Sequence, residues 1–468
     1  MKTNRLNKIL LIIFILFPGA YPDAQTVFPV TAKQAVDLAF KNVMELKNAN
    51  IDYQLQKAKN KEYTSAALPQ VSGTIGMNHY FSQPTIGFEN SNYYLYNNLI
   101  DQGVKGANGN AITRPDFASS PLLDFSFVYP WNMNYGVQLN QLLFQPDVFV
   151  ALKARKAALE LAEDNTRVKE DAVKLNVYKT YYAVLVAEKQ LWFLKESIAR
   201  LEKLLHDQNE IYKNGFAEKL DIDKTTVSLN NLSATSYQLR NGITINYMIL
   251  KNALGVKQID SLVLKDTLSE DMVKNEMLTT DNFNYDDRNE IKTLKKASEL
   301  MKMDVFRNKI SKYPTMALYG NFNSQAQRNN FDFYTNKKWI NTALVGINIS
   351  IPLYTGGARL YRLQQARLTL EKNNNTIENV KQLIDMEQGI AKNTYTNSVL
   401  ALDVQNRNIA LAKKVYETTK KKYEQGLGSS FEILQADTEL QQANGNYFKA
   451  LYDAIIARIS YLKATGKL

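Results

Sequence analysis

Strictly alternating apolar and polar positions mark two segments, and each runs directly into a long helical pattern. From Val345 to Leu353 every second residue is apolar, while Gly346, Asn348 and Ser350 fall between them. The segment Tyr135–Phe144 alternates in a similar way. A two-residue period predicts a strand with one apolar and one polar face. Such a strand suits either a half-buried soluble sheet or a membrane barrel with a wet lumen.

Two features predict very long helices: the scarcity of glycine and proline, and the helical spacing of the apolar residues. After Pro146 there is no glycine or proline up to Tyr212, and 358–423 contains a single glycine. Apolar residues in these stretches recur at steps of three and four, which predicts coiled-coil seams. Return helices are expected over 218–254 and 430–465, with glycine turns between. An earlier helix should begin at the Thr31 capping box and run to about residue 67.

The chain contains an internal duplication. VQLNQLLF at 137–144 aligns with INISIPLY at 347–354, and YKNGFAEKLDI at 212–222 aligns with YEQGLGSSFEI at 423–433. Before the strands the offset is 245 residues, as between Pro69 and Pro314, and after them it is 210. The first copy therefore holds 35 extra residues. The segment 84–133, rich in Asn and Tyr, is expected to be an extracellular loop; a sheet decoration in the periplasm is the alternative.

This duplication divides the chain into two structural repeats, 25–256 and 286–468, with an acidic connector at 257–285. Each repeat reads helix–strand–strand–long helix–helix. The strands are expected at about 70–82, 134–145, 315–325 and 341–353, and the helical tips near 213–217 and 425–429.

The first 24 residues predict a secretory signal peptide. Lys2, Arg5 and Lys8 precede the apolar run Ile9–Phe17, and small residues follow it. This run is too short to cross a bilayer as a helix. Beyond it, no apolar stretch approaches the ~18–20 residues that a membrane helix needs.

Composition argues against most enzymes and metal proteins. The chain has no Cys and two His, His79 and His206, which lie far apart and are not expected to be functional. No nucleophile–base set, phosphate-binding glycine motif or metal-ligand spacing is present, so no enzyme activity, cofactor or metal is expected. The net charge of +11 could indicate nucleic acid, but export and the lack of an aromatic–basic cluster argue against it.

Aromatic residues border the predicted strands in a pattern similar to the girdles of a bilayer interface. Four strands cannot close a barrel, and lipid tolerates no open sheet edge. About twelve strands are needed to leave a lumen, so a conducting barrel requires at least three chains. The aromatic residues are Tyr80, Phe81, Tyr129, Trp131, Tyr135, Phe331, Phe333, Tyr334 and Trp339.

On three motifs the chain resembles the TolC-type outer-membrane efflux family. They are Leu68-Pro69 after the first helix, IPLYTGG at 351–357, and the paired YxxG tips at Tyr212 and Tyr423. The resemblance covers essentially the whole chain after the signal. It implies a mainly α fold with membrane β-strands: a homotrimer with a twelve-stranded barrel in outer-membrane lipid, continued by an α-helical coiled-coil tunnel in the periplasm. The implied partners are a periplasmic adaptor protein and an inner-membrane pump.

The same resemblance implies where the tunnel narrows. Alignment on the tip glycines places Glu432 at the family's first acidic ring, and Asp221 and Tyr423 at a link between the two hairpins. Two positions depart from the pattern, because Gln435 stands where a second acid is common and Gly428 where an arginine is common. In the alternative interpretation, Glu432 and Asp221 are only acids that favour a helix N-terminus. The adaptor-docking tips would comprise Gly215, Phe216, Gly426, Leu427 and Gly428.

Two rival functions remain at this point. The first is a non-conducting periplasmic coiled-coil adaptor or structural protein, which leaves the aromatic strand borders and the duplication unexplained. The second is a secreted enzyme. The sequence favours an exit duct for efflux or type I secretion, and it does not identify the cargo.

Overall fold

The computed structural model describes residues 27–274, 283–335 and 338–468. The predicted signal peptide at 1–24 lies outside these residues. The chain divides into two compact units, and each takes residues from both predicted repeats. Unit 1 comprises the described residues up to Leu55, with Leu159–Ala297 and Asn373–Leu468; unit 2 comprises Gln56–Ala158 and Ser298–Lys372.

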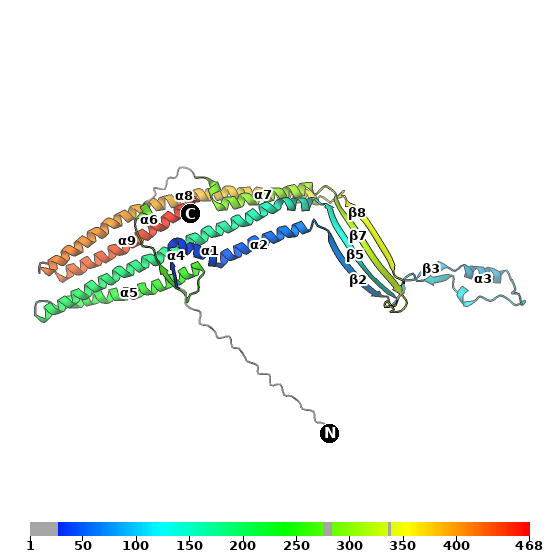
Figure 1. Ribbon diagram of the computed structural model, residues 1–468, viewed down its shortest axis with the longest axis horizontal. Coiled ribbons are helices and arrows are strands. Elements are labelled where there is room, and N and C mark those ends of the chain that lie inside the picture. Colours follow the sequence, from blue (N-terminus) through cyan, green and yellow to red (C-terminus); the bar gives the residue numbers. More distant parts are fainter. Residues whose placement is uncertain (1–26, 275–282, 336–337) are drawn as a thin grey trace, which may run out of the picture. The chain divides into compact units, whose positions relative to one another are not determined.

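Helices dominate, as expected, and two of them are exceptionally long. Among the described residues, the prediction of a mainly helical chain with a smaller set of strands is confirmed (Figure 1). The helices are α1 (Ala32–Asn42), α2 (Met44–Ser65), α3 (Ser91–Asp101), α4 (Pro146–Lys213), α5 (Lys219–Leu254), α6 (Asp271–Lys274), α7 (Asn289–Ile310), α8 (Ala358–Glu424) and α9 (Ser430–Ala464). The strands are β1 (Val27–Val30), β2 (Gln70–His79), β3 (Ile86–Glu89), β4 (Leu122–Phe125), β5 (Trp131–Phe144), β6 (Ser261–Leu264), β7 (Thr315–Arg328) and β8 (Ile340–Ser350). No helix in the described ranges is both long and apolar enough to cross a membrane.

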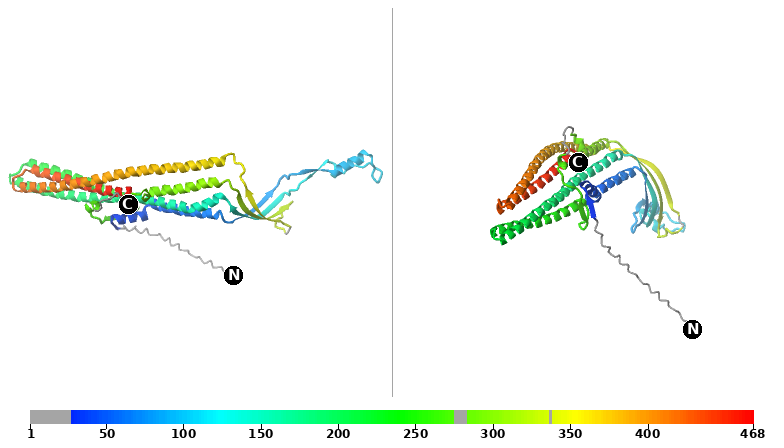
Figure 2. Two further views of the ribbon diagram at one scale, coloured as in Figure 1. Left: turned by 90° about the horizontal axis from the view of Figure 1, so that it is seen from above. Right: turned by 60° about the vertical axis from the view of Figure 1, so that its left-hand side comes forward.

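Unit 2 is built on a four-stranded antiparallel sheet in the order β2-β5-β7-β8. Figures 1 and 2 show these four strands side by side. Both outer strands, β2 and β8, have one edge that pairs with no other strand of the described chain. The sheet therefore ends in two open edges, and each carries unpaired backbone N–H and C=O groups.

The register separates the two faces of this sheet by polarity. Val71 pairs with Leu139, and Leu139 pairs through Gly320 with Val345, so apolar side chains form a continuous face. In its middle, Ile75 and Val345 are 81% and 79% exposed, so nothing in the described part of the chain covers this region. The opposite face is lined mainly by amides and hydroxyls: Ser72, Thr74, Asn78, Asn132, Asn134, Gln138, Asn140, Asn321, Asn323, Gln325, Asn348 and Ser350.

The segment predicted as a loop at 84–133 carries its own structure. Strands β3 and β4 form an antiparallel pair, and α3 lies between them in sequence. Asn90 is fully buried at the start of α3, where its amide donates to the carbonyl oxygens of Phe117 and Ser120, and its side chain accepts from two backbone N–H groups. One asparagine thus caps the helix and ties it to the chain that returns to the sheet.

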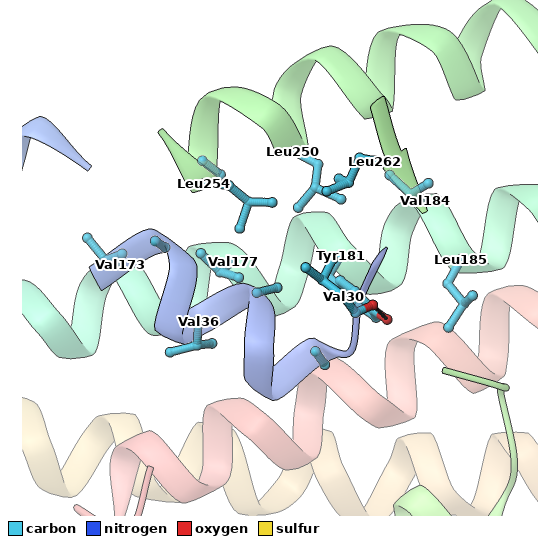
Figure 3. Close-up of a cluster of buried hydrophobic side chains, with 14 of the residues drawn as sticks. Val30, Val36, Val173, Val177, Tyr181, Val184, Leu185, Leu250, Leu254 and Leu262 are labelled. Atoms are coloured by element: carbon cyan, nitrogen blue, oxygen red, sulfur yellow. Dashed lines mark hydrogen bonds between the residues drawn. The ribbon is translucent and has the colours of Figure 1, made fainter. Parts of the chain in front are cut away.

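The core of unit 1 packs the first helix against the long helices. Val36 of α1, Tyr181 of α4 and Leu250 of α5 lie in one buried cluster (Figure 3). The Tyr181 hydroxyl donates to the Val30 carbonyl oxygen at 3.1 Å, which ties α4 to β1. Burial raises the pKa of Tyr181 well above its ordinary value. The hydroxyl therefore stays protonated and remains a donor at physiological pH.

The return helices α5 and α9 end in the same way, which gives the duplication a structural counterpart. Gly255 and Gly466 both adopt positive φ, at 66° and 71°. A Cβ at Gly255 would lie 2.7 Å from the Asn42 carbonyl carbon, and one at Gly466 would lie 2.9 Å from the Asp287 Cβ. Each glycine therefore permits a left-handed helix end. Each also permits a close approach to another segment, which is the one before α2 for Gly255 and the one before α7 for Gly466.

Three details differ from the sequence-based expectations. The first helix is two helices, because Val43 adopts an extended conformation between α1 and α2. Strand β8 ends at Ser350 rather than near 353, ahead of Pro352. The segment interpreted as a connector contains β6, which pairs in parallel with β1. The Thr31 capping box is present as predicted, with Gln34 closing it.

Candidate functional site

Two helical tips in unit 1 hold the predicted site residues. Gly215 follows α4 and Gly426 follows α8, and both adopt positive φ, at 83° and 72°. These backbone conformations favour glycine and allow the chain to reverse within a few residues. Phe216 and Leu427 follow the two glycines and are 85% and 77% exposed. Each tip therefore presents one large apolar side chain to its surroundings.

Glu432 and Gln435 lie in the first turns of α9. Ser429 caps this helix, and its hydroxyl accepts from the Glu432 backbone N–H at 3.2 Å. A carboxylate here interacts favourably with the helix dipole. Gln435 is turned along its own helix, because its amide donates to Glu439 Oε1 at 2.9 Å. Glu432 Oε2 lies 3.5 Å from the position that a Cβ would take at Gly428. Gly428, where the resemblance implies an arginine, therefore lies beside this acid.

Tyr423 of α8 and Asp221 of α5 come from different hairpins, and Tyr423 also meets Gln208 of α4. Burial raises the pKa of Tyr423, a hydrogen bond from Gln208 opposes that rise, and the charges of Asp221 and Asp207 add to it. The Gln208 amide also donates to Ser430 Oγ at 2.5 Å. This group therefore links the α4–α5 hairpin to the α8–α9 hairpin close to both tips.

A second link between the hairpins centres on Asp437, which sequence analysis missed. Asp437 of α9 is 2% exposed, and it accepts from Ser197 Oγ at 2.5 Å and from Arg200 Nε at 2.8 Å. The Arg200 guanidinium lies over the Tyr416 ring, 5.2 Å from its centroid. A buried carboxylate is costly unless it is paired and hydrogen-bonded. Here both donors come from α4, so the carboxylate holds α9 against the other hairpin.

A signal for this link is present in the seam spacing. Ser430, Ile433, Asp437, Leu440 and Asn444 recur on α9 at alternating steps of three and four. On α4 the same steps connect Leu194, Ser197, Leu201, Leu204 and Gln208. Polar residues at seam positions lie buried between helices and need partners across the seam. Matching the two seams in antiparallel register pairs Gln208 with Ser430 and places Asp437 opposite Leu201, one seam step from Ser197, which is its partner in the structure.

Metal binding has no support in this region. No group of three or more His, Asp or Glu residues in the described chain could hold a metal ion. His206 lies on α4 near the tip, whereas His79 lies on the sheet, where its ring stacks on Trp131 at 4.1 Å between centroids. The site is therefore one of helix–helix contacts and exposed tips.

Known proteins resemble this chain in sequence and in fold. The family model described as "outer membrane efflux protein" matches residues 307–467. The outer membrane protein TolC of Vibrio cholerae serotype O1 is 23% identical over 345 residues, which cover 72% of this chain and 77% of that protein. Over residues 307–467 the chain is therefore similar to outer membrane efflux proteins, and the similarity to TolC extends over 72% of it.

Two further proteins extend the comparison. The protease secretion protein PrtF of Dickeya chrysanthemi is 18% identical over 66% of this chain and 67% of its own length. The crystal structure of CusC superposes with a TM-score of 0.71 at 15% identity, covering 96% of this chain and 95% of CusC. The chain therefore shares the fold of CusC over nearly its whole length.

Proposed function

We propose that the chain is one protomer of an outer-membrane exit duct, with its sheet in the membrane and its helical hairpins in the periplasm. One observation carries this proposal. The four-stranded sheet has an exposed apolar face, an amide-lined face and two open edges. An apolar face suits lipid and a polar face suits a water-filled lumen. Open edges are not tolerated in lipid, so they must pair with other copies.

Three copies supply the smallest barrel that conducts. Eight strands would fill their own interior with side chains, whereas twelve leave a lumen. Strands β5 and β8 both lead into the longest helices, α4 and α8, so every copy would bring the same pair of helices to a shared wall. The homotrimer would therefore enclose a passage that begins at the helical tips and ends at the barrel.

Transport through this passage is proposed to be passive, with the energy supplied by an inner-membrane pump through a periplasmic adaptor. The exposed side chains of Phe216 and Leu427 would dock the adaptor, together with Gly215, Gly426 and Gly428. Both efflux and type I secretion fit this scheme: one relative is named for the secretion of proteases, and CusC is described by its transmembrane channel. A non-conducting periplasmic adaptor is the second candidate, but it gives no role to an exposed apolar sheet face.

Purified full-length protein added to a planar lipid bilayer should produce stepwise ionic currents.

We further propose that Glu432, with Asp221, Tyr423 and Gln435 nearby, lines the periplasmic aperture. Three Glu432 carboxylates around one axis would attract cations in a narrow throat. Glu432→Gln should lower the cation-to-anion permeability ratio roughly fivefold, the factor for about 1 kcal/mol of lost attraction.

Glu371→Gln is the matched control, because Glu371 is an exposed acid on α8 that lies more than fifty residues before Gly426. This variant should conduct as the wild type does. Unchanged selectivity in Glu432→Gln would remove that residue from the throat while leaving the duct intact. Absence of any current from the wild type would instead favour the adaptor alternative.

A further inference from the structure

Four helices join the central sheet of unit 2, and all of them meet it at the same end (Figure 1). Helices α2 and α7 lead into β2 and β7, whereas α4 and α8 follow β5 and β8. Because neighbouring strands are antiparallel, these strand ends lie side by side. The helical and turn residues of unit 2 therefore surround one end of the sheet. They comprise 56–69, 145–158, 298–314 and 351–372, and are called the basic belt below.

Net positive charge is concentrated in the basic belt. Its residues include 14 Lys and Arg but only 5 Asp and Glu, a net charge of +9. The whole chain carries +11, so the other 401 residues contribute only +2. Strands β2, β5 and β8 contain no Asp, Glu, Lys or Arg, and β7 contains only Arg328, at its far end. The positive charge therefore begins where the uncharged sheet ends.

The bases closest to the sheet are available to a ligand. Lys309 and Lys312 lie at the end of α7 and in the turn after it, and Arg359 and Arg362 lie in the first two turns of α8. Lys309, Lys312 and Arg362 are exposed, and Arg359 is partly exposed. None of the four has an ion-pair partner among the described residues. Like charges gathered in this way repel one another, so an anionic partner would stabilise the belt.

Exposed aromatic side chains lie among these bases. Phe306, Tyr313 and Tyr361 are 48%, 49% and 64% exposed, and Lys312 Nζ lies 5.4 Å from the centroid of the Tyr313 ring. Ile349, on the apolar face at the same end of the sheet, is exposed as well. Aromatic rings beside Lys and Arg, next to an apolar surface, are typical of the headgroup level of a bilayer. This combination favours a lipid surface over a soluble polyanion.

We propose that the Lys and Arg side chains of the basic belt bind the headgroups of anionic phospholipids in the membrane leaflet that faces the periplasm. This inference rests on the proposed function, which places the sheet in the membrane and the helical tips in the periplasm. The phosphate oxygens accept from the basic side chains, while the acyl chains contact the apolar face of the sheet. The two contacts together fix the depth of the sheet, because a shift in either direction would break one of them.

Electron paramagnetic resonance of spin-labelled lipids tests this proposal. Full-length protein is reconstituted into phosphatidylcholine vesicles with a trace of labelled phosphatidylglycerol or of labelled phosphatidylcholine with the same acyl chains. The motionally restricted fraction of each label measures its association with the protein. The wild type should prefer phosphatidylglycerol roughly fivefold, which corresponds to the attraction of one Lys or Arg for an anionic headgroup. High salt should reduce this preference, because it screens the charges.

The test variant removes the four bases closest to the sheet and should lose most of the preference. It should fold, because all four side chains are at least partly exposed and make no ion pair within the described chain. The four substitutions are Lys309→Gln, Lys312→Gln, Arg359→Gln and Arg362→Gln.

The matched control removes four exposed bases of α8 that lie in unit 1, outside the belt. It changes the net charge by the same amount and should keep the preference of the wild type. The four substitutions are Lys392→Gln, Arg407→Gln, Lys413→Gln and Lys414→Gln.

Equal restriction of the two labels by the wild type would overturn the proposal and leave a periplasmic polyanion as the partner of the belt. A preference that survives in the test variant, or one that the control loses equally, would also overturn it. Absence of a restricted component for either lipid is a separate result. It would place the sheet outside the membrane and so contradict the proposed function itself.

Discussion

Replacing Asp437 by asparagine should release the two hairpins of each protomer from one another. The substitution removes the charge that holds Arg200, whose side chain is only 27% exposed, and weakens the bond from Ser197. Breaking a buried ion pair by removing one partner costs about 3–5 kcal/mol; since Arg200 retains some access to water, about 2–3 kcal/mol is expected here. In the proposed duct, this release should also raise the fraction of time that the channel spends open.

Thermal unfolding, followed by the helical circular-dichroism signal, measures the lost stability. Single-channel recording in a planar bilayer measures the open probability. Glu439→Gln is the control, because Glu439 lies on the same helix and is exposed. It should behave as the wild type. The double substitution Arg200→Met with Asp437→Leu should recover much of the stability, since apolar residues can replace a buried pair without leaving a charge unpaired. If Asp437→Asn and Glu439→Gln unfold at the same temperature, Asp437 does not hold the hairpins together.

Placing an arginine on the apolar face of the sheet should prevent membrane assembly. Val345 is 79% exposed in the single chain, so Val345→Arg disturbs no packing within the protomer. In a barrel the same side chain would face lipid, where an arginine near the bilayer midplane costs about 2–4 kcal/mol per copy. Three copies multiply that cost. The variant should be exported but largely absent from the outer-membrane fraction.

Asn348→Arg provides the matched comparison. Asn348 lies on the same strand with its side chain on the opposite, amide-lined face, which would meet water. This variant should assemble normally and shift ion selectivity towards anions. Equal recovery of both variants in the outer-membrane fraction would show that the apolar face does not contact lipid.

Much of this fold is predictable because its dominant patterns are local. Alternation through 137–140 and 345–349 predicts strands, and the near absence of glycine and proline over more than sixty residues predicts the long helices. Elements that depend on distant pairing are not predictable in this way. Strands β1 and β6 have four residues each and meet across more than two hundred residues. The break at Val43 has no glycine or proline beside it, and Gly255, which approaches it closely, lies more than two hundred residues later in the sequence.

The candidate site shows the same difference between residues with a local sequence signal and residues that depend on distant contacts. The tip glycines and the acids beside them follow from an alignment of the two repeats, because a reversal between two helices leaves a local signature. Asp437 is a different case. Its position within an apolar seam is visible in sequence, but only the register between α4 and α9 shows that Ser197 and Arg200 meet it. The roles of Glu432, Asp221, Tyr423 and Gln435 in the aperture stay predictions until conductance is measured.

The number of chains in the native particle tests the central claim most directly. Native mass spectrometry of the full-length protein, extracted from outer membranes in a mild detergent, measures that number without assuming any structure. We expect a particle of three chains, because each chain contributes four strands with two open edges. A particle of one or two chains that still conducts ions in a planar bilayer would contradict it.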